Sequence, residues 1–323
     1  MILFGKTSRG SRKQHRQTVA RLPMMDWAVG RNLWAVSERL IVFVVAVGIT
    51  AGLVATSTRG VSAADDPTET ASPSEMQYPL AVAVKSAKEI FVADRKLPGI
   101  WRVAGDDRDV YFLGSKKFRT PLNAVRCVRL DREGRLLAGD SATREVYRIE
   151  AGKDPVPLTN GGIGIPMDLA VDREGRIYVS DLETHRIWRR PADGSSLEVF
   201  ASVPAPRGIA LDSEDRLLVV SHGKDHVVRL TTTGETEVVV AGRPFQFPHQ
   251  IAVHPDGSLF ISDGYAKTIW RVPPQMPPVP FVTGAPLIQP VGLEMHEGEL
   301  YVADPRAQGI FRVNAEGQVT KLP

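Results

Sequence analysis

The chain of 323 residues has one cysteine, Cys127, and only 7% aromatic residues. A single cysteine excludes an intrachain disulfide and any metal site built on paired cysteines. Glycine-rich phosphate loops and nucleophile elbows are also missing, and no stretch after residue 64 repeats its apolar residues at helical spacing. The composition, 43% hydrophobic and 24% charged, is that of a globular protein and excludes collagen, wholesale disorder and a multi-span membrane protein.

Positive charge is concentrated at the N-terminus. Residues 1–63 hold nine Lys or Arg and two acids, a net of +7, whereas the remaining residues hold 31 Lys or Arg and 35 Asp or Glu, a net of −4. The sequence pI of about 9.0 therefore reflects the leader. Because the rest is mildly acidic, we expect no nucleic-acid binding by the main domain.

The leader, residues 1–63, has the layout of a secretory signal. Basic residues precede an uncharged, apolar segment at 40–58, and small residues that a signal peptidase accepts follow, with cleavage after Ala63 or Ala64. The apolar segment is also close to the roughly 17–25 residues that span a membrane, so an uncleaved anchor is the alternative. Both interpretations export the rest of the chain, to the periplasm or outside the cell, and limit membrane contact to the N-terminal segment. Residues 64–77 are polar and read as a linker.

Internal repetition is the strongest pattern in the sequence. Six times an apolar run ends in Asp or Ser, with Ile or Val six residues later and Arg eight residues later, at spacings of 46, 41, 40, 42 and 41. We call the residues that end these runs the repeat aspartates: Asp94, Asp140, Asp181, Ser221 (a serine in this role), Asp263 and Asp304.

Each repeat reads as four short strands. In the third repeat, strands are expected at 166–171, 176–181, 186–189 and 197–200. Six such units predict an all-β fold, a six-bladed β-propeller of four-stranded blades, over residues 78–323, with 41 residues per blade. The expected blades are about 78–120, 121–165, 166–205, 206–247, 248–289 and 290–323.

The repeats resemble NHL repeats and, more widely, the six-bladed superfamily of SMP-30/gluconolactonase-like proteins. Pro206–Leu211, Leu300–Asp304 and His185–Arg189 carry the resemblance, while the absence of a Trp-Asp dipeptide argues against WD40 repeats. The resemblance covers all six units, is specific for the fold and is weak for function. It implies that the innermost strand of each blade starts at the rim of a central channel.

Residues present in every repeat are expected to be structural, so candidate functional residues are those that differ between blades. We expect the two residues after the starting proline of each blade to point at the channel mouth, where most are apolar. The polar exceptions, predicted to bind a ligand, are Asn123, Asp168, Arg207, His249 and Gln250.

His249 is the candidate catalytic residue. Pro248–Val253 resembles blades of peptide-amidating and streptogramin lyases, in which a histidine beside this proline lies at the active site. His222 and Tyr265 are expected at the same rim and complete the predicted ligand-binding set. A tris-histidine zinc site is not available, because the equivalent positions of the other blades hold no histidine.

The gluconolactonase-like proteins hold a divalent cation with side-chain oxygens at the channel mouth. By that resemblance, Asn123 and Asp168 are candidate ligands for a divalent cation such as calcium. They fall one position from where the ligands of that family lie, and the N-terminal glutamate of that family is not evident.

Three functions are open at this stage. The first is a binding module whose channel mouth receives a small molecule, a peptide or a protein loop. The second is a metal-dependent hydrolase of a lactone-like substrate, or a lyase, with His249 as acid or base. The third is a purely architectural surface protein.

Overall fold

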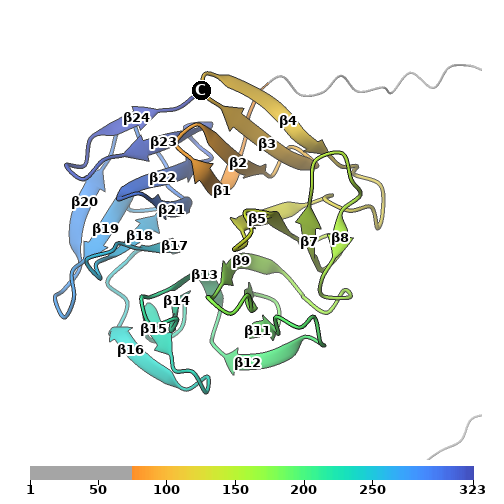
Figure 1. Cartoon of the computed structure of the whole chain (residues 1–323). Helices are drawn as coiled ribbons and strands as arrows, with labels where there is room; N and C mark the ends of the chain where they lie inside the picture. The colour runs from red at the N-terminus through yellow and green to blue at the C-terminus, as the bar shows by residue number, and fades with distance from the viewer. Residues whose placement is uncertain (1–74) are drawn as a thin grey trace, which may run out of the picture. The chain divides into compact units, whose positions relative to one another are not determined.

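The computed structural model describes residues 75–323, which form six four-stranded antiparallel sheets arranged in a ring (Figure 1). This confirms the predicted six-bladed β-propeller. Among the described residues no helix is long and apolar enough to cross a membrane. The predicted leader 1–63, its apolar segment 40–58 and all but the last three residues of the linker 64–77 lie outside the described residues.

Every blade is a meander of four strands that follow one another in the chain. The strands of the first three blades are β1 (Pro79–Ser86), β2 (Glu89–Asp94), β3 (Gly99–Ala104) and β4 (Asp107–Leu113); β5 (Val125–Leu130), β6 (Leu136–Asp140), β7 (Glu145–Ile149) and β8 (Val156–Pro157); β9 (Pro166–Val171), β10 (Ile177–Asp181), β11 (Arg186–Arg190) and β12 (Glu198–Ser202).

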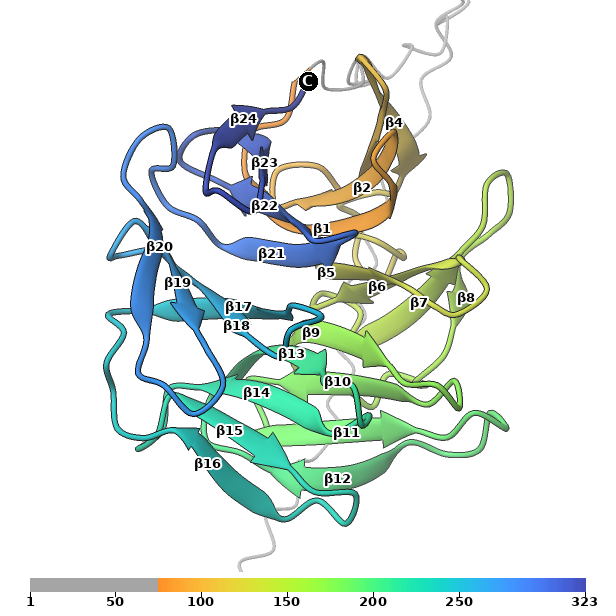
Figure 2. The same cartoon turned by 60° about the vertical axis from the view of Figure 1, so that its left-hand side comes forward.

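The remaining three blades repeat this order (Figure 2). Their strands are β13 (Pro206–Leu211), β14 (Leu217–Ser221), β15 (Val227–Leu230) and β16 (Thr236–Val240); β17 (Pro248–Val253), β18 (Leu259–Asp263), β19 (Thr268–Val272) and β20 (Val279–Thr283); β21 (Gly292–His296), β22 (Glu299–Asp304), β23 (Gly309–Val313) and β24 (Val319–Lys321).

The repeat aspartates fix the start of each blade. The buried carboxylate of Asp94 accepts hydrogen bonds from the backbone N–H groups of Gln77 and Tyr78, which enter the blade, and of Lys96, in the loop after β2. The other four aspartates bond in the same way. Ser221 in the fourth blade instead donates its hydroxyl to the carbonyl of Pro204. The repeated acid is therefore a structural cap, as its recurrence predicted.

Apolar side chains are buried between neighbouring blades. Six buried clusters occupy the six interfaces of the ring, including the one between the sixth and first blades, where Val82 and Trp101 pack with Tyr301 and Ile310. The ring closes through this side-chain packing, because each sheet contains only strands of its own blade.

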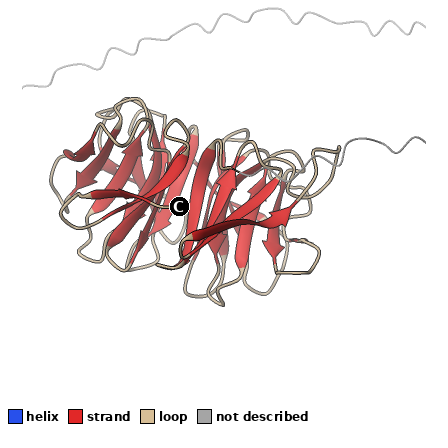
Figure 3. Ribbon diagram, turned by 90° about the horizontal axis from the view of Figure 1, so that it is seen from above, coloured by secondary structure: helices blue, strands red, loops and turns tan. Residues whose placement is uncertain are grey.

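Alternation of strand direction gives the ring two faces, which Figure 3 shows from the side. Loops between the second and third strands of a blade, and those between successive blades, lie on one face, which we call the mouth face. Loops between the first and second and between the third and fourth strands lie on the opposite face.

Candidate functional site

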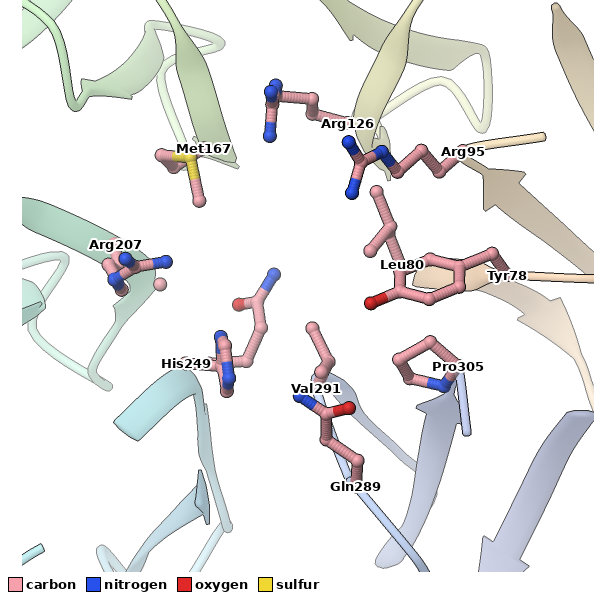
Figure 4. A pocket seen from close by; sticks show the side chains of 12 residues that line it. Tyr78, Leu80, Arg95, Arg126, Met167, Arg207, His249, Gln289, Val291 and Pro305 are labelled. Atoms are coloured by element: carbon pink, nitrogen blue, oxygen red, sulfur yellow. The ribbon is translucent and has the colours of Figure 1, made fainter. Parts of the chain in front are cut away.

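The first strands of the six blades surround the channel and begin at the mouth face (Figure 1). One residue at the start of each strand, or directly before it in the case of β21, lines a single cavity of about 170 Å³, the mouth cavity (Figure 4). These six residues are Leu80, Arg126, Met167, Arg207, His249 and Val291.

Loop residues complete the wall of the mouth cavity. Arg95 and Pro305 follow the repeat aspartates of the first and sixth blades, while Tyr78 and Gln289 precede the first strands of the same two blades. Gly208 and Gln250, one position further along their strands, also line the wall. The mouth cavity is therefore built from all six blades.

In the second blade, the predicted start of the first strand is wrong. With Pro121 as the starting proline of this blade, the prediction places Asn123 at the mouth. The strand begins four residues later, because Val125 pairs with Asp140 just as Pro166 pairs with Asp181. The residue that lines the cavity is therefore Arg126, which the sequence analysis missed.

Asn123 and Asp168 do not lie together in the cavity wall. The side-chain amide of Asn123 donates to the carbonyl oxygen of Lys117, 2.9 Å away. Asp168 is fully buried, because the strand turns alternate side chains to opposite sides, and its carboxylate accepts bonds from Arg129 and from the N–H of Ile209. The two predicted cation ligands are thus engaged separately, Asn123 as a donor to a carbonyl and Asp168 as an acceptor from protein donors.

Positive charge dominates the mouth cavity. Three arginines, Arg95, Arg126 and Arg207, line it, and none of its lining residues is Asp or Glu. Burial, and then repulsion from Arg95, lowers the pKa of Arg126, while burial and Arg126 lower that of Arg207. Each guanidinium nonetheless stays charged near neutral pH, so the cavity is an uncompensated cationic site.

Several polar atoms of the cavity wall are buried without a hydrogen-bonding partner among residues 75–323. They are Nε of Arg207, Nε2 of His249 and Oε1 of Gln250. Burial, reinforced by the charge of Arg207 and then by His222, lowers the pKa of His249 to about 3. His249 is therefore neutral at physiological pH.

Two glycines leave room for these side chains. A Cβ atom on Gly264 would lie 2.9 Å from Nε2 of His249, and one on Gly208 would lie 2.5 Å from the Cα atom of Gln250. Any larger residue at either position would displace the wall of the cavity.

His222 and Tyr265 lie behind the cavity wall. His222 Nε2 is 2.7 Å from the carbonyl oxygen of Pro248, and its ring meets the edge of Phe247 at a centroid distance of 4.4 Å. Tyr265 stacks on Phe247, 4.7 Å away, and the guanidinium of Arg207 covers that phenylalanine ring at 4.7 Å. Phe247 therefore supports Arg207, and both predicted residues pack against it outside the cavity lining.

The other end of the channel also contains an arginine. Arg129 on β5 forms ion pairs with Asp168 at 3.1 Å and with Glu294 at 3.7 Å, and it donates to the carbonyl of Leu169. Burial raises the pKa of Glu294 to about 7, although Arg129 opposes the shift. Here the positive charge is compensated by neighbouring acids.

The mouth cavity does not fit the divalent cation that the gluconolactonase resemblance implies. Calcium prefers six to eight oxygen ligands, whereas this cavity offers guanidinium groups, an imidazole and two glutamine amides. Within residues 75–323 there is no group of three or more His, Cys, Asp or Glu side chains that could hold a metal ion. Charge repulsion from the arginines also disfavours a cation.

Comparison with known proteins supports the repeat assignment. The family model described as "NHL repeat" matches residues 164–189, which span the first two strands and the start of the third in the third blade. Residues 164–189 are therefore similar to an NHL repeat. No curated protein matches the chain significantly in sequence.

Solved structures share the fold at low identity. A gluconolactonase from Xanthomonas campestris is 17% identical, covering 77% of this chain and 87% of its own, with a TM-score of 0.61. Virginiamycin B lyase from Staphylococcus aureus is 17% identical, covering 77% and 85%, with a TM-score of 0.59. A chain of the Nidogen/Laminin complex is 16% identical, covering 70% and 90%, with a TM-score of 0.59. Enzymes and a protein-binding protein thus share this propeller, so the fold alone does not decide between them.

Proposed function

We propose that this propeller is a binding protein whose mouth cavity holds a small organic anion. The observation that carries the proposal is the set of three guanidinium groups at a cavity without any carboxylate in its lining. Arginine pairs with carboxylates and phosphates through parallel hydrogen bonds.

The remaining wall suits the rest of such a ligand. Leu80, Met167 and Val291 offer an apolar side to the cavity, and the amides of Gln250 and Gln289 offer polar contacts. An acidic side chain of a peptide or protein loop would present the same carboxylate. The likeness to a chain of the Nidogen/Laminin complex supports a protein ligand of this kind.

A calorimetric titration tests the proposal with the predicted mature form, residues 65–323. Gluconate and sorbitol share a six-carbon polyol chain but differ in the carboxylate, so we expect heat of binding with gluconate only. Arg207→Gln should weaken gluconate binding at least tenfold, because a hydrogen bond to a charged group contributes about 1.5–3 kcal/mol. Arg173→Gln, at an exposed arginine of the opposite face, should leave binding unchanged.

Two results would reject this proposal. One is equal binding of gluconate and sorbitol, which would show that the carboxylate is not recognised. The other is no binding of gluconate, citrate or inorganic phosphate by a protein that melts cooperatively.

A hydrolase or lyase is the second candidate, and His249 favours it. Its imidazole lies in the cavity wall with Nε2 unpartnered, and one solved neighbour, 18% identical, is a catalytically inactive histidine-to-alanine variant of virginiamycin B lyase. With a pKa of about 3, His249 is a weak base. A bound anion would offset the positive charge of Arg207 and so raise the pKa of His249. Turnover of a lactone or of quinupristin that His249→Gln abolishes would establish this activity.

Export remains part of the proposal. The order of basic residues, an apolar segment at 40–58 and small residues through Ala64 supports a signal or an anchor. The N-terminal residue and mass of the protein recovered from its native compartment would distinguish cleavage from anchoring.

A further inference from the structure

The two faces of the propeller carry opposite charge. Loops of the mouth face, with the entry segment 75–78, contain ten Lys or Arg and three Asp or Glu, a net of +7. Loops of the opposite face contain seven Lys or Arg and fifteen Asp or Glu, a net of −8. The small net charge of the propeller therefore conceals a strong asymmetry, which an averaged charge could not predict.

The loop 114–124, between the first and second blades, combines positive charge with an exposed aromatic ring. Its residues Lys116, Lys117, Phe118 and Arg119 are all exposed, and Phe118 is 86% accessible. The guanidinium of Arg119 lies 5.2 Å from the centroid of the phenylalanine ring. Neither lysine side chain forms an ion pair with any residue of the described propeller.

Two further exposed apolar side chains lie on the same face. Tyr265, between β18 and β19, is 63% accessible, and Ile288, between β20 and β21, is 47% accessible. In the opposite-face loops of the described propeller, Met276 is the one large apolar side chain of comparable exposure. Exposed apolar and basic residues therefore occur together on the mouth face.

The polypeptide also enters the propeller on this face. Tyr78, which lines the mouth cavity, donates its backbone N–H to Asp94 immediately before β1 begins. The predicted signal or anchor, residues 40–58, precedes the first described residue by sixteen residues, 59–74. If that segment holds the protein in a membrane, the polypeptide that follows it enters the propeller on the mouth face.

We propose that the mouth face is a peripheral docking surface for an anionic lipid bilayer. Basic side chains are attracted to the negative surface of such a bilayer, and aromatic and aliphatic side chains beside them insert into its headgroup region. An acidic protein or a nucleic acid would match the charge, and a base could stack on Phe118. Neither accounts for Ile288, an exposed aliphatic side chain on the same face.

Vesicle sedimentation tests this proposal on residues 65–323, which lack the predicted apolar segment. This form contains all six buried clusters, so it retains the whole core of the ring. We expect sedimentation with vesicles containing about 30% phosphatidylglycerol, little with pure phosphatidylcholine, and loss of binding as salt is raised. Lys116→Glu with Lys117→Glu should lower the partition coefficient at least tenfold, because each lysine near such a surface contributes about fivefold.

Matched variants of the opposite face serve as controls. Lys88→Glu with Lys153→Glu makes the same change in charge, and Met276→Ser matches Phe118→Ser in the loss of an exposed apolar side chain. The proposal requires both control variants to bind like wild type and Phe118→Ser to bind at least threefold more weakly.

Three outcomes would overturn the proposal: no difference between anionic and neutral vesicles, an equal loss in the opposite-face variants, or binding to a 20-nucleotide single strand or a poly-glutamate peptide without binding to vesicles. Circular dichroism melts of each variant ensure that a loss of binding is not a loss of folding.

Discussion

The two ends of the channel each hold an arginine, but one lies among acidic side chains and the other among basic ones. Arg126 and Arg129 lie three residues apart on β5, one at the mouth cavity and one at the opposite end. Arg129 forms ion pairs with Asp168 and Glu294. Arg126 instead lies near the like charges of Arg95 and Arg207. Its guanidinium donates one hydrogen bond, to the hydroxyl of Ser141. Breaking a buried ion pair destabilises the fold because it leaves a charge without its partner, whereas a guanidinium without an acidic partner is available to a ligand.

Exchange of each arginine for glutamine should separate these roles most strongly. Arg129→Gln leaves Asp168 buried without its ionic partner, so we expect the free energy of unfolding to fall by about 3–5 kcal/mol. Arg126→Gln removes a charge that its neighbours repel, and the free energy should stay within about 1 kcal/mol of wild type. Urea unfolding at neutral pH measures the free energy of unfolding of both variants. Equal decreases in the two variants would contradict the distinction between the two ends.

The pH dependence of stability should also differ between the two ends. The pKa of His249 falls from 6.5 to about 3 on folding, so its contribution is complete above pH 6.5 and is lost as pH falls toward 3. The pKa of Glu294 rises from 4.5 to about 7, so its contribution is complete below pH 4.5 and is lost as pH rises through 7. Between pH 4 and pH 8 each shift covers about 2.5 pH units, so we expect each substitution to remove on the order of 3 kcal/mol: His249→Gln from the loss of stability below pH 6.5, and Glu294→Gln from the loss between pH 4.5 and 7.

Urea unfolding at intervals from pH 4 to pH 8 checks both effects. Wild type supplies the reference profile, and Lys88→Gln, at an exposed position, should reproduce it. Profiles of His249→Gln and Glu294→Gln that both run parallel to wild type would show that neither group titrates as its surroundings indicate.

The fold could be predicted from the sequence because its causes are local and repeated. Each repeat aspartate binds the backbone of its own blade entry, so the same residue is needed at nearly the same interval in five of the six blades. Short strands and turn acids then define four-stranded units without reference to distant contacts.

The site could be predicted only in part. Proline marks the strand start in the blades of Arg207 and His249, and the structure places both side chains in the cavity wall. Arg126 was missed because Val125 replaces the proline, although counting fourteen residues back from Asp140 would have found it. Arg95 lies in a loop, and no sequence periodicity predicts where a loop side chain points.

Asp168 was misplaced for a different reason. In β9 only Met167 lines the mouth cavity and Asp168 is fully buried, whereas at the equivalent positions of β17 both His249 and Gln250 line it. The interblade ion pair with Arg129 joins residues 39 positions apart, and no local pattern indicates such a contact.

The most direct test of the central claim compares wild type with Arg126→Gln in urea, with and without gluconate. If the mouth cavity binds an organic anion, saturating gluconate should raise the free energy of unfolding of wild type by about 2.7 kcal/mol at one hundred times the dissociation constant. The same concentration should raise that of Arg126→Gln far less, and sorbitol should raise neither. An equal gain in both proteins, or no gain in wild type with gluconate, citrate or phosphate, would contradict the account.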